Sequence, residues 1–190
     1  MRRFRRAFGA IAAMVVLLQP TSRAVATPGS AIARDLALEL TLRRTGSAPL
    51  GLLPPVSVAI VNRSRLATYP VVLPGDGSAS GLRPPRTWLT AEGHTDAGWR
   101  PLGEPRQGHC GLYAVDWARD VVRLAPGARR LLSAAYPLLP WDLRGVDRVR
   151  VVAHYAYALT TRGSAPPPSM ADVPEYELTS NAVEVVVAGS

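Results

Sequence analysis

Apolar and polar residues alternate with a period of two along much of this chain. Leucine occupies every second position of Leu36–Leu42, and Val56–Ile60 alternates valine or isoleucine with small residues. Near the C-terminal end, Val149–Tyr157 and Val183–Val187 repeat the pattern. Because successive side chains of a strand point to opposite faces of a sheet, this period predicts strands that each bury one face.

Turn-forming residues mark further strands between these segments. Tyr69–Leu73 is a short apolar run followed by Pro-Gly-Asp-Gly, a sequence typical of a turn. Val121–Leu124 and Arg129–Ala134 flank Ala-Pro-Gly, which favours a reversal of the chain. Another strand is expected at Arg86–Thr90, whereas the rest of the stretch 75–118 is polar and rich in Gly and Pro. We expect an irregular, loop-rich middle there.

About seven short strands separated by Pro/Gly turns, with almost no helix, predict an all-β fold, an antiparallel two-sheet β-sandwich. Helical structure is expected only as a single turn within Pro137–Leu143, because prolines on both sides prevent a long helix. The segment Thr161–Pro174 holds three consecutive prolines with Gly and Ser. We expect an exposed, polyproline-like connection at this position.

The first 26 residues, Met1–Ala26, have the pattern of an export signal. An arginine-rich start precedes the twelve-residue apolar run Ala7–Leu18, and Ala24-Val25-Ala26 is a small-x-small cleavage pattern. The run is shorter than the roughly 20 residues of a membrane-spanning helix, so we expect no permanent membrane anchor. Arg5-Arg6 leaves open whether export uses the twin-arginine or the general secretory route, to the periplasm or the exterior.

These boundaries predict a signal peptide at 1–26, a flexible N-terminal segment at 27–34 and one domain at 35–188. All 22 basic residues are arginine, against 14 acidic residues. Five of the arginines lie in the signal, which leaves 17 against 14, a net charge of +3, and we therefore expect no nucleic-acid binding. Because Cys110 is the only cysteine, no internal disulfide can form. It is free or pairs with another chain.

Three segments carry a family resemblance. Leu124-Ala125-Pro126-Gly127, the tyrosine-bearing strand Val149–Tyr157 and the terminal segment Ser180–Val185 together resemble immunoglobulin-like and fibronectin type III-like domains of exported bacterial proteins. The resemblance implies an immunoglobulin-like arrangement of the two sheets. The chain departs from antibody-type domains in lacking a cysteine pair, and it is longer than a fibronectin type III module, with the extra length between residues 75 and 118.

One cluster has the composition of a metal site. Glu92, His94 and Asp96 would share a face on a strand, and His109 or Cys110 could complete the ligand shell. The alternative interpretation is a polar, glycine-containing surface loop. A nucleophile–base pair of His109 and Cys110 would need an unusual bend, because neighbours on an extended chain point oppositely. We assign no catalytic residue and expect no cofactor.

Aromatic residues gather in the same part of the chain, as Trp88, Trp99, Trp117, Trp141 and Tyr113. Exposed together, they could stack against a sugar or a peptide. Tryptophan usually buries most of its surface, so core packing is the preferred interpretation.

Two functions from different classes remain. The first is a non-enzymatic exported module of the cell envelope that binds a protein, a peptide or a glycan, with a proteinase-inhibitor-like module that uses Thr161–Pro174 as one version. The second is a metal-dependent or hydrolytic enzyme that uses Glu92, His94, Asp96 and His109. The ligand and the oligomeric state stay open.

Overall fold

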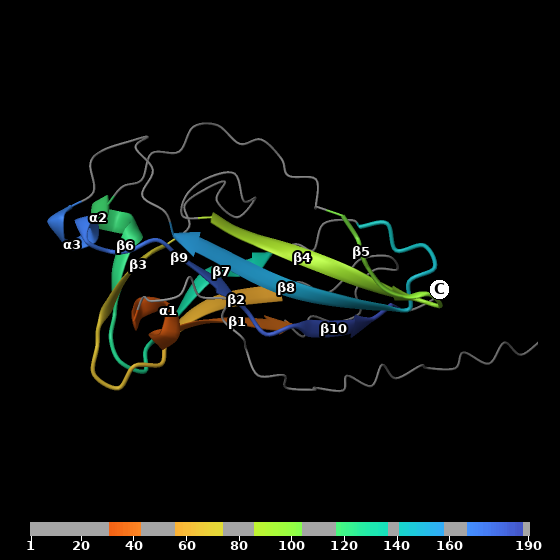
Figure 1. Ribbon diagram of the computed structural model, residues 1–190, viewed down its shortest axis with the longest axis horizontal. Helices are drawn as coiled ribbons and strands as arrows, with labels where there is room; N and C mark the ends of the chain where they lie inside the picture. Colours follow the sequence, from red (N-terminus) through yellow and green to blue (C-terminus); the bar gives the residue numbers. More distant parts are fainter. Residues whose placement is uncertain are drawn as a thin grey trace, which may run out of the picture.

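The computed structural model describes residues 31–42, 56–73, 86–103, 117–136, 141–157 and 167–187. These residues are mostly β-strand, as the period-two pattern predicts (Figure 1). The elements in chain order are α1 (Ala31–Asp35), β1 (Leu36–Leu42), β2 (Val56–Asn62), β3 (Tyr69–Val72), β4 (Arg86–Thr95), β5 (Gly98–Pro101), α2 (Trp117–Asp120), β6 (Val121–Leu124), β7 (Arg129–Tyr136), β8 (Arg148–Tyr157), α3 (Pro168–Ala171), β9 (Tyr176–Thr179) and β10 (Val183–Val186).

All strand pairs in the described residues are antiparallel. One sheet has the order β1-β2-β7, and a larger sheet has the order β10-β8-β4-β5. Strands β9 and β10 follow one another along the same edge of β8, since β9 pairs with the end of β8 and β10 with its beginning. A separate pair, β3 and β6, extends the two sheets at one end. An all-β fold is thus confirmed.

Strand β8 is central to the larger sheet and alternates strictly. Its ten residues are buried at every second position and half-buried at each position between. Inward-facing side chains include Val149, Val151 and Tyr155, all fully buried. The outward-facing set includes Arg148, Arg150 and His154. One strand therefore supplies both the core and an exposed face.

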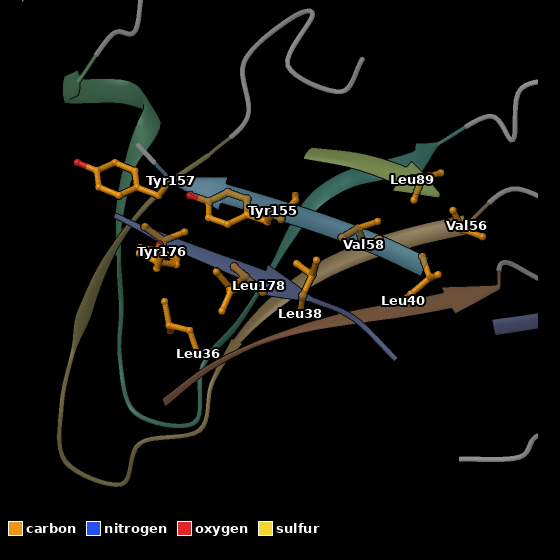
Figure 2. Packing of buried hydrophobic residues seen from close by; sticks show 14 of the residues in the cluster. Leu36, Leu38, Leu40, Val56, Val58, Leu89, Tyr155, Tyr157, Tyr176 and Leu178 are labelled. Carbon is orange, nitrogen blue, oxygen red and sulfur yellow. The ribbon is translucent and has the colours of Figure 1, made fainter. Parts of the chain in front are cut away.

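The core gathers side chains from both sheets into one cluster. Leu36, Leu38 and Leu40 of β1 and the apolar residues of β2 lie across from the inner face of β8 (Figure 2). Burial of each such side chain stabilises the fold by roughly 1.5–3 kcal/mol. The hydroxyl of Tyr155 donates a hydrogen bond to the carbonyl oxygen of Val72 at 2.8 Å, which ties the β3–β6 pair to the larger sheet.

Asn62 is a fully buried polar residue where the two turns of the β2–β3 and β6–β7 connections meet. Its side-chain amide donates to the carbonyl oxygens of Ala67 at 2.7 Å and Leu124 at 2.9 Å. Its Oδ1 accepts from the backbone N–H of Ser64 at 2.9 Å. Every polar atom of the side chain is thus satisfied, and both turns depend on one residue.

A second asparagine joins the two sheets. The Oδ1 atom of Asn181 accepts from the backbone N–H of Leu40 at 3.0 Å, and its Nδ2 donates to the Leu40 carbonyl at 3.0 Å. The residue lies between β9 and β10. Just before it, the Ser180 hydroxyl accepts from the backbone N–H of Ala153 on β8 at 2.9 Å, in the place where a strand would offer a carbonyl oxygen. The side-chain amide therefore pairs with β1 as a peptide group of a neighbouring strand would.

The expectation of an irregular stretch around Glu92–Gly98 is wrong. Strand β4 continues to Thr95, and a turn at Asp96 leads into β5. Apolar patterning is weak here because the inward-facing position is Gly93. A Cβ at that position would lie 2.7 Å from a Leu102 methyl and 2.9 Å from Val146, so these side chains fill the space under the strand.

Three smaller expectations also differ from the structure. Residues 31–34, expected in the flexible N-terminal segment, belong to α1, which buries Ile32 and Ala33. Within Thr161–Pro174, α3 interrupts the expected exposed connection, and Met170 is fully buried. No helical turn occurs at 141–143, where the Asp142 carboxylate instead accepts from the backbone N–H of Arg144. Strand β9 was not expected from the sequence.

Several expectations fall on residues outside the described ranges. These are the export signal at 1–26, residues 27–30, His109, Cys110, Tyr113, residues 137–140 and residues 161–166.

Replacement of Asn62 by Ala is expected to lower the free energy of unfolding by about 2–4 kcal/mol, because it leaves the Leu124 carbonyl buried without a donor. Urea denaturation followed by circular dichroism measures the change. Ser64→Ala is the matched control, since the Ser64 hydroxyl accepts only from nearby turn N–H groups, and a loss below about 1 kcal/mol is expected. Equal losses in both variants would contradict this role of Asn62.

Candidate functional site

The face of the larger sheet that points away from the core is the strongest candidate site in the described residues. The antiparallel register of β4 and β8 places Trp88 opposite His154, Glu92 opposite Arg150, and His94 opposite Arg148. We call this surface the outer face, and its members are Trp88, Thr90, Glu92, His94, Trp99, Asp147, Arg148, Arg150, Val152, His154, Glu177, Thr179 and Glu184. All of them are half-buried or exposed.

Arg150 is the centre of the outer face. Its guanidinium binds the Glu184 carboxylate at 2.9 Å, lies 3.7 Å from that of Glu92, and sits 4.2 Å from the centre of the Trp99 ring. The Arg148 guanidinium approaches the same ring at 5.6 Å. Cation–π contact and charge pairing hold these side chains together, and Trp99 stays half-exposed beside them.

His94 and Asp147 form a polar pair at one end of the outer face. The Nδ1 atom of His94 donates to an Asp147 carboxylate oxygen at 2.8 Å, and this hydrogen bond lowers the pKa of Asp147 below its ordinary value. The Asp147 backbone N–H donates to the His94 carbonyl at 3.2 Å, so main chain and side chain fix the same pair. Because Gly93 has no side chain, Val146 can pack directly beneath it, and this packing brings the next residue, Asp147, beside His94.

His154 occupies the opposite end of the outer face. Its ring stacks on Trp88 with centroids 4.9 Å apart and planes only 9° from parallel. Its Nε2 lies 3.0 Å from the Thr90 hydroxyl and its Nδ1 3.4 Å from the Thr179 hydroxyl. Burial lowers the pKa of His154, and the Glu177 carboxylate opposes that shift. Burial therefore favours the neutral form of the ring.

The predicted metal ligands have other partners here. Glu92 lies beside Arg150, His94 is bonded to Asp147, and Asp96 is exposed in the β4–β5 turn. In the described ranges no group of three or more His, Cys, Asp or Glu side chains is placed to hold a metal. His109 lies outside those ranges, so the four-residue metal site stays a prediction.

The tryptophans divide between core and surface. Trp141 is buried and Trp117 packs partly against the core, as the preferred interpretation predicted. Trp88 and Trp99 instead lie on the outer face, where they are half-exposed. Sequence reasoning missed the roles of Arg150 and Asp147, because their partners on β4 and β10 are assembled only by the register of the sheet.

Comparison with models of protein families, with curated proteins and with solved structures yielded no match for this chain. None of the helices in the described residues is long and apolar enough to cross a membrane.

Replacement of Glu177 by Gln is expected to lower the pKa of His154 further, because it removes the charge that opposes the effect of burial. NMR titration of the imidazole C2 proton measures this pKa, with Glu92→Gln as a control on the same face. Since the pKa of His154 in the folded state lies below the ordinary 6.5, the stability that neutral His154 contributes is fully present above pH 6.5. It is lost as the pH falls through the folded-state pKa. A raised pKa in Glu177→Gln would contradict this account.

Metal analysis of the protein purified without chelator is expected to give substoichiometric zinc and copper, because His94 and Glu92 already have partners. Elemental analysis by mass spectrometry makes the measurement, with the His94→Ala/His109→Ala double variant as the comparison. One metal ion per chain that disappears in the variant would instead establish the metal site.

Proposed function

We propose that the chain is an exported immunoglobulin-like β-sandwich that acts as a non-enzymatic binding module of the cell envelope. The export pattern of Met1–Ala26 supports the location. The shared core of the β1-β2-β7 sheet and the larger sheet supports the sandwich. The binding surface is the outer face.

The observation that carries the proposal is the half-exposed cluster of Trp99 and Arg150 on the outer face, next to the end that holds His94 and Asp147. Tryptophan and arginine are the side chains that most often dominate binding energy in protein interfaces. Here they are held in fixed positions by Glu184 and by the cation–π contact. Because they are already ordered, little conformational entropy is lost on binding.

A folded protein fits this face better than a glycan. A sugar ring stacks on an open aromatic face, whereas the Trp99 ring has the Arg150 guanidinium 4.2 Å from its centre. The neighbouring Glu92, Glu184 and Arg148 form a charged surround that a partner with opposite charges can pair with. We therefore place an envelope protein first among the expected partners.

An inhibitor-like module would use Thr161–Pro174 as its contact segment. Met170 in this segment is fully buried, which gives the segment a role in packing. The contact is therefore placed on the outer face instead.

One observation favours an enzyme as the second candidate. The His94–Asp147 pair has the arrangement in which a carboxylate orients an imidazole as a general base. Within the described part of the chain, however, no Ser, Thr or Cys side chain is hydrogen-bonded to His94. The binding function accounts for more of the outer face.

A photo-crosslinking amino acid at Thr90, exposed on the outer face, tests the binding function in cells that produce and export the chain. The expected result is one protease-sensitive adduct of defined mass. Trp99→Ala and Arg150→Ala are each expected to reduce its yield at least about tenfold, as truncation of a central interface residue does. Arg144→Ala, outside the outer face, is the matched control.

The same crosslinker at Leu131, half-exposed on β7 of the other sheet, reports contacts that do not involve the outer face. Equal adducts from positions 90 and 131 would overturn the assignment of the surface. A protease-resistant adduct would overturn the choice of a protein as partner.

A further inference from the structure

The end of the molecule opposite β5 carries an exposed leucine among arginines. Leu66, in the connection between β2 and β3, is 91% exposed, the largest exposed fraction among the large apolar side chains of the described residues. We call this end the basic tip: Arg63, Arg65 and Leu66 lie in the β2–β3 connection, Arg34 in α1, Arg123 on β6 opposite Pro70, and Arg130 on β7 opposite Ile60. In Figure 1 the β2–β3 and β6–β7 connections form this end together, at the lower left.

Backbone hydrogen bonds hold the segments of the basic tip side by side. The N–H of Arg63 donates to the carbonyl of Asp35 at 2.7 Å, which joins the end of α1 to the β2–β3 connection. The N–H of Gly127 donates to the carbonyl of Asn62 at 3.0 Å, which joins the β6–β7 turn to it. The Ser64 hydroxyl accepts from the N–H groups of Leu66 and Ala67, so the apex has a fixed conformation.

The basic tip has an excess of positive charge. All five of its arginines are exposed, and none forms an ion pair in the part of the chain that the structure describes. Glu39 pairs with Arg129 at 3.2 Å, and the Asp35 carboxylate, which accepts from the Tyr69 hydroxyl, offsets only one of the five arginine charges. The complementary partner is therefore a surface dense in negative charge.

The shape of the basic tip favours a surface over a small molecule. The hollow that Arg34 and Arg63 line with β1 and β9 has a volume of only about 90 Å³. That is well below the roughly 300 Å³ of a small ligand pocket. An exposed apolar side chain next to Arg65, with further exposed arginines at the same end of the molecule, instead matches the boundary between anionic headgroups and acyl chains.

We propose that the basic tip docks on an anionic phospholipid surface. The arginines bind headgroup phosphates, and Leu66 enters the boundary between headgroups and acyl chains. This contact is peripheral and reversible, because one leucine and a few arginines supply far less free energy than a membrane-spanning helix. It is independent of partner binding at the outer face, because the outer face belongs to the larger sheet and the basic tip is formed by α1, the β2–β3 connection, β6 and β7.

A fluorophore that reports polarity, attached at position 66, tests the proposal in the full chain. The variant Leu66→Cys is combined with Cys110→Ser, and the control carries the label through Arg100→Cys on β5. With vesicles of phosphatidylglycerol and phosphatidylcholine, the label at 66 is expected to shift its emission to the blue, and the label at 100 to stay unchanged. Vesicles of phosphatidylcholine alone are expected to give no shift.

The charge dependence is tested in the same assay. Arg63→Glu/Arg65→Glu is expected to weaken the vesicle partitioning reported by the label at 66 by about 30-fold or more, as loss of two surface arginines implies. Thermal unfolding confirms that this variant folds. Equal responses at positions 66 and 100, or an unchanged affinity in the charge-reversal variant, would overturn the proposal. So would binding of double-stranded DNA that competes with vesicles while the label at 66 shows no blue shift.

Discussion

The pairing register of β8 is the constraint on which the rest of the structure depends. This strand pairs with β4 on one edge and with β9 and β10 on the other, and its side chains alternate between core and solvent along its whole length. A slip of one residue would exchange Tyr155 with His154 and bury Arg150. The hydrophobic core and the outer face are therefore two results of one register, and neither can change without the other.

The positions of the side chains on the outer face depend on the apolar packing beneath them. Asp147 lies beside His94 because Val146 packs under Gly93. A Cβ at position 93 would lie less than 3 Å from Val146, so no larger residue fits there. Similarly, Arg150 projects over Trp99 because its neighbours Val149 and Val151 are fully buried on the other side of the strand. Surface geometry in this protein is thus set by apolar contacts that a view of the surface alone does not show.

The sequence predicts β1, β2, β8 and β10 because apolar residues recur at every second position of each strand, although β2 is buried on both faces and β10 is only half-buried. It does not predict the β4–β5 hairpin, since Leu102 and Val146 fill the inner position that Gly93 leaves empty. The outer face, too, depends on contacts between residues far apart in the sequence. His94 is recognisable as a candidate, but its partner Asp147 is 53 residues away and is brought close only by the pairing of β4 with β8.

The amide of Asn181 has a consequence for how this protein meets copies of itself. An unpaired strand edge offers N–H and C=O groups to any extended chain, and it is a common starting point for aggregation. At Leu40 both groups are already bonded to Asn181, and Leu38 and Leu40 have almost no exposed surface. A single side chain thus blocks the edge of β1 at Leu40 against sheet-to-sheet growth, a task that many β proteins give to a bulge, a lysine or a further strand.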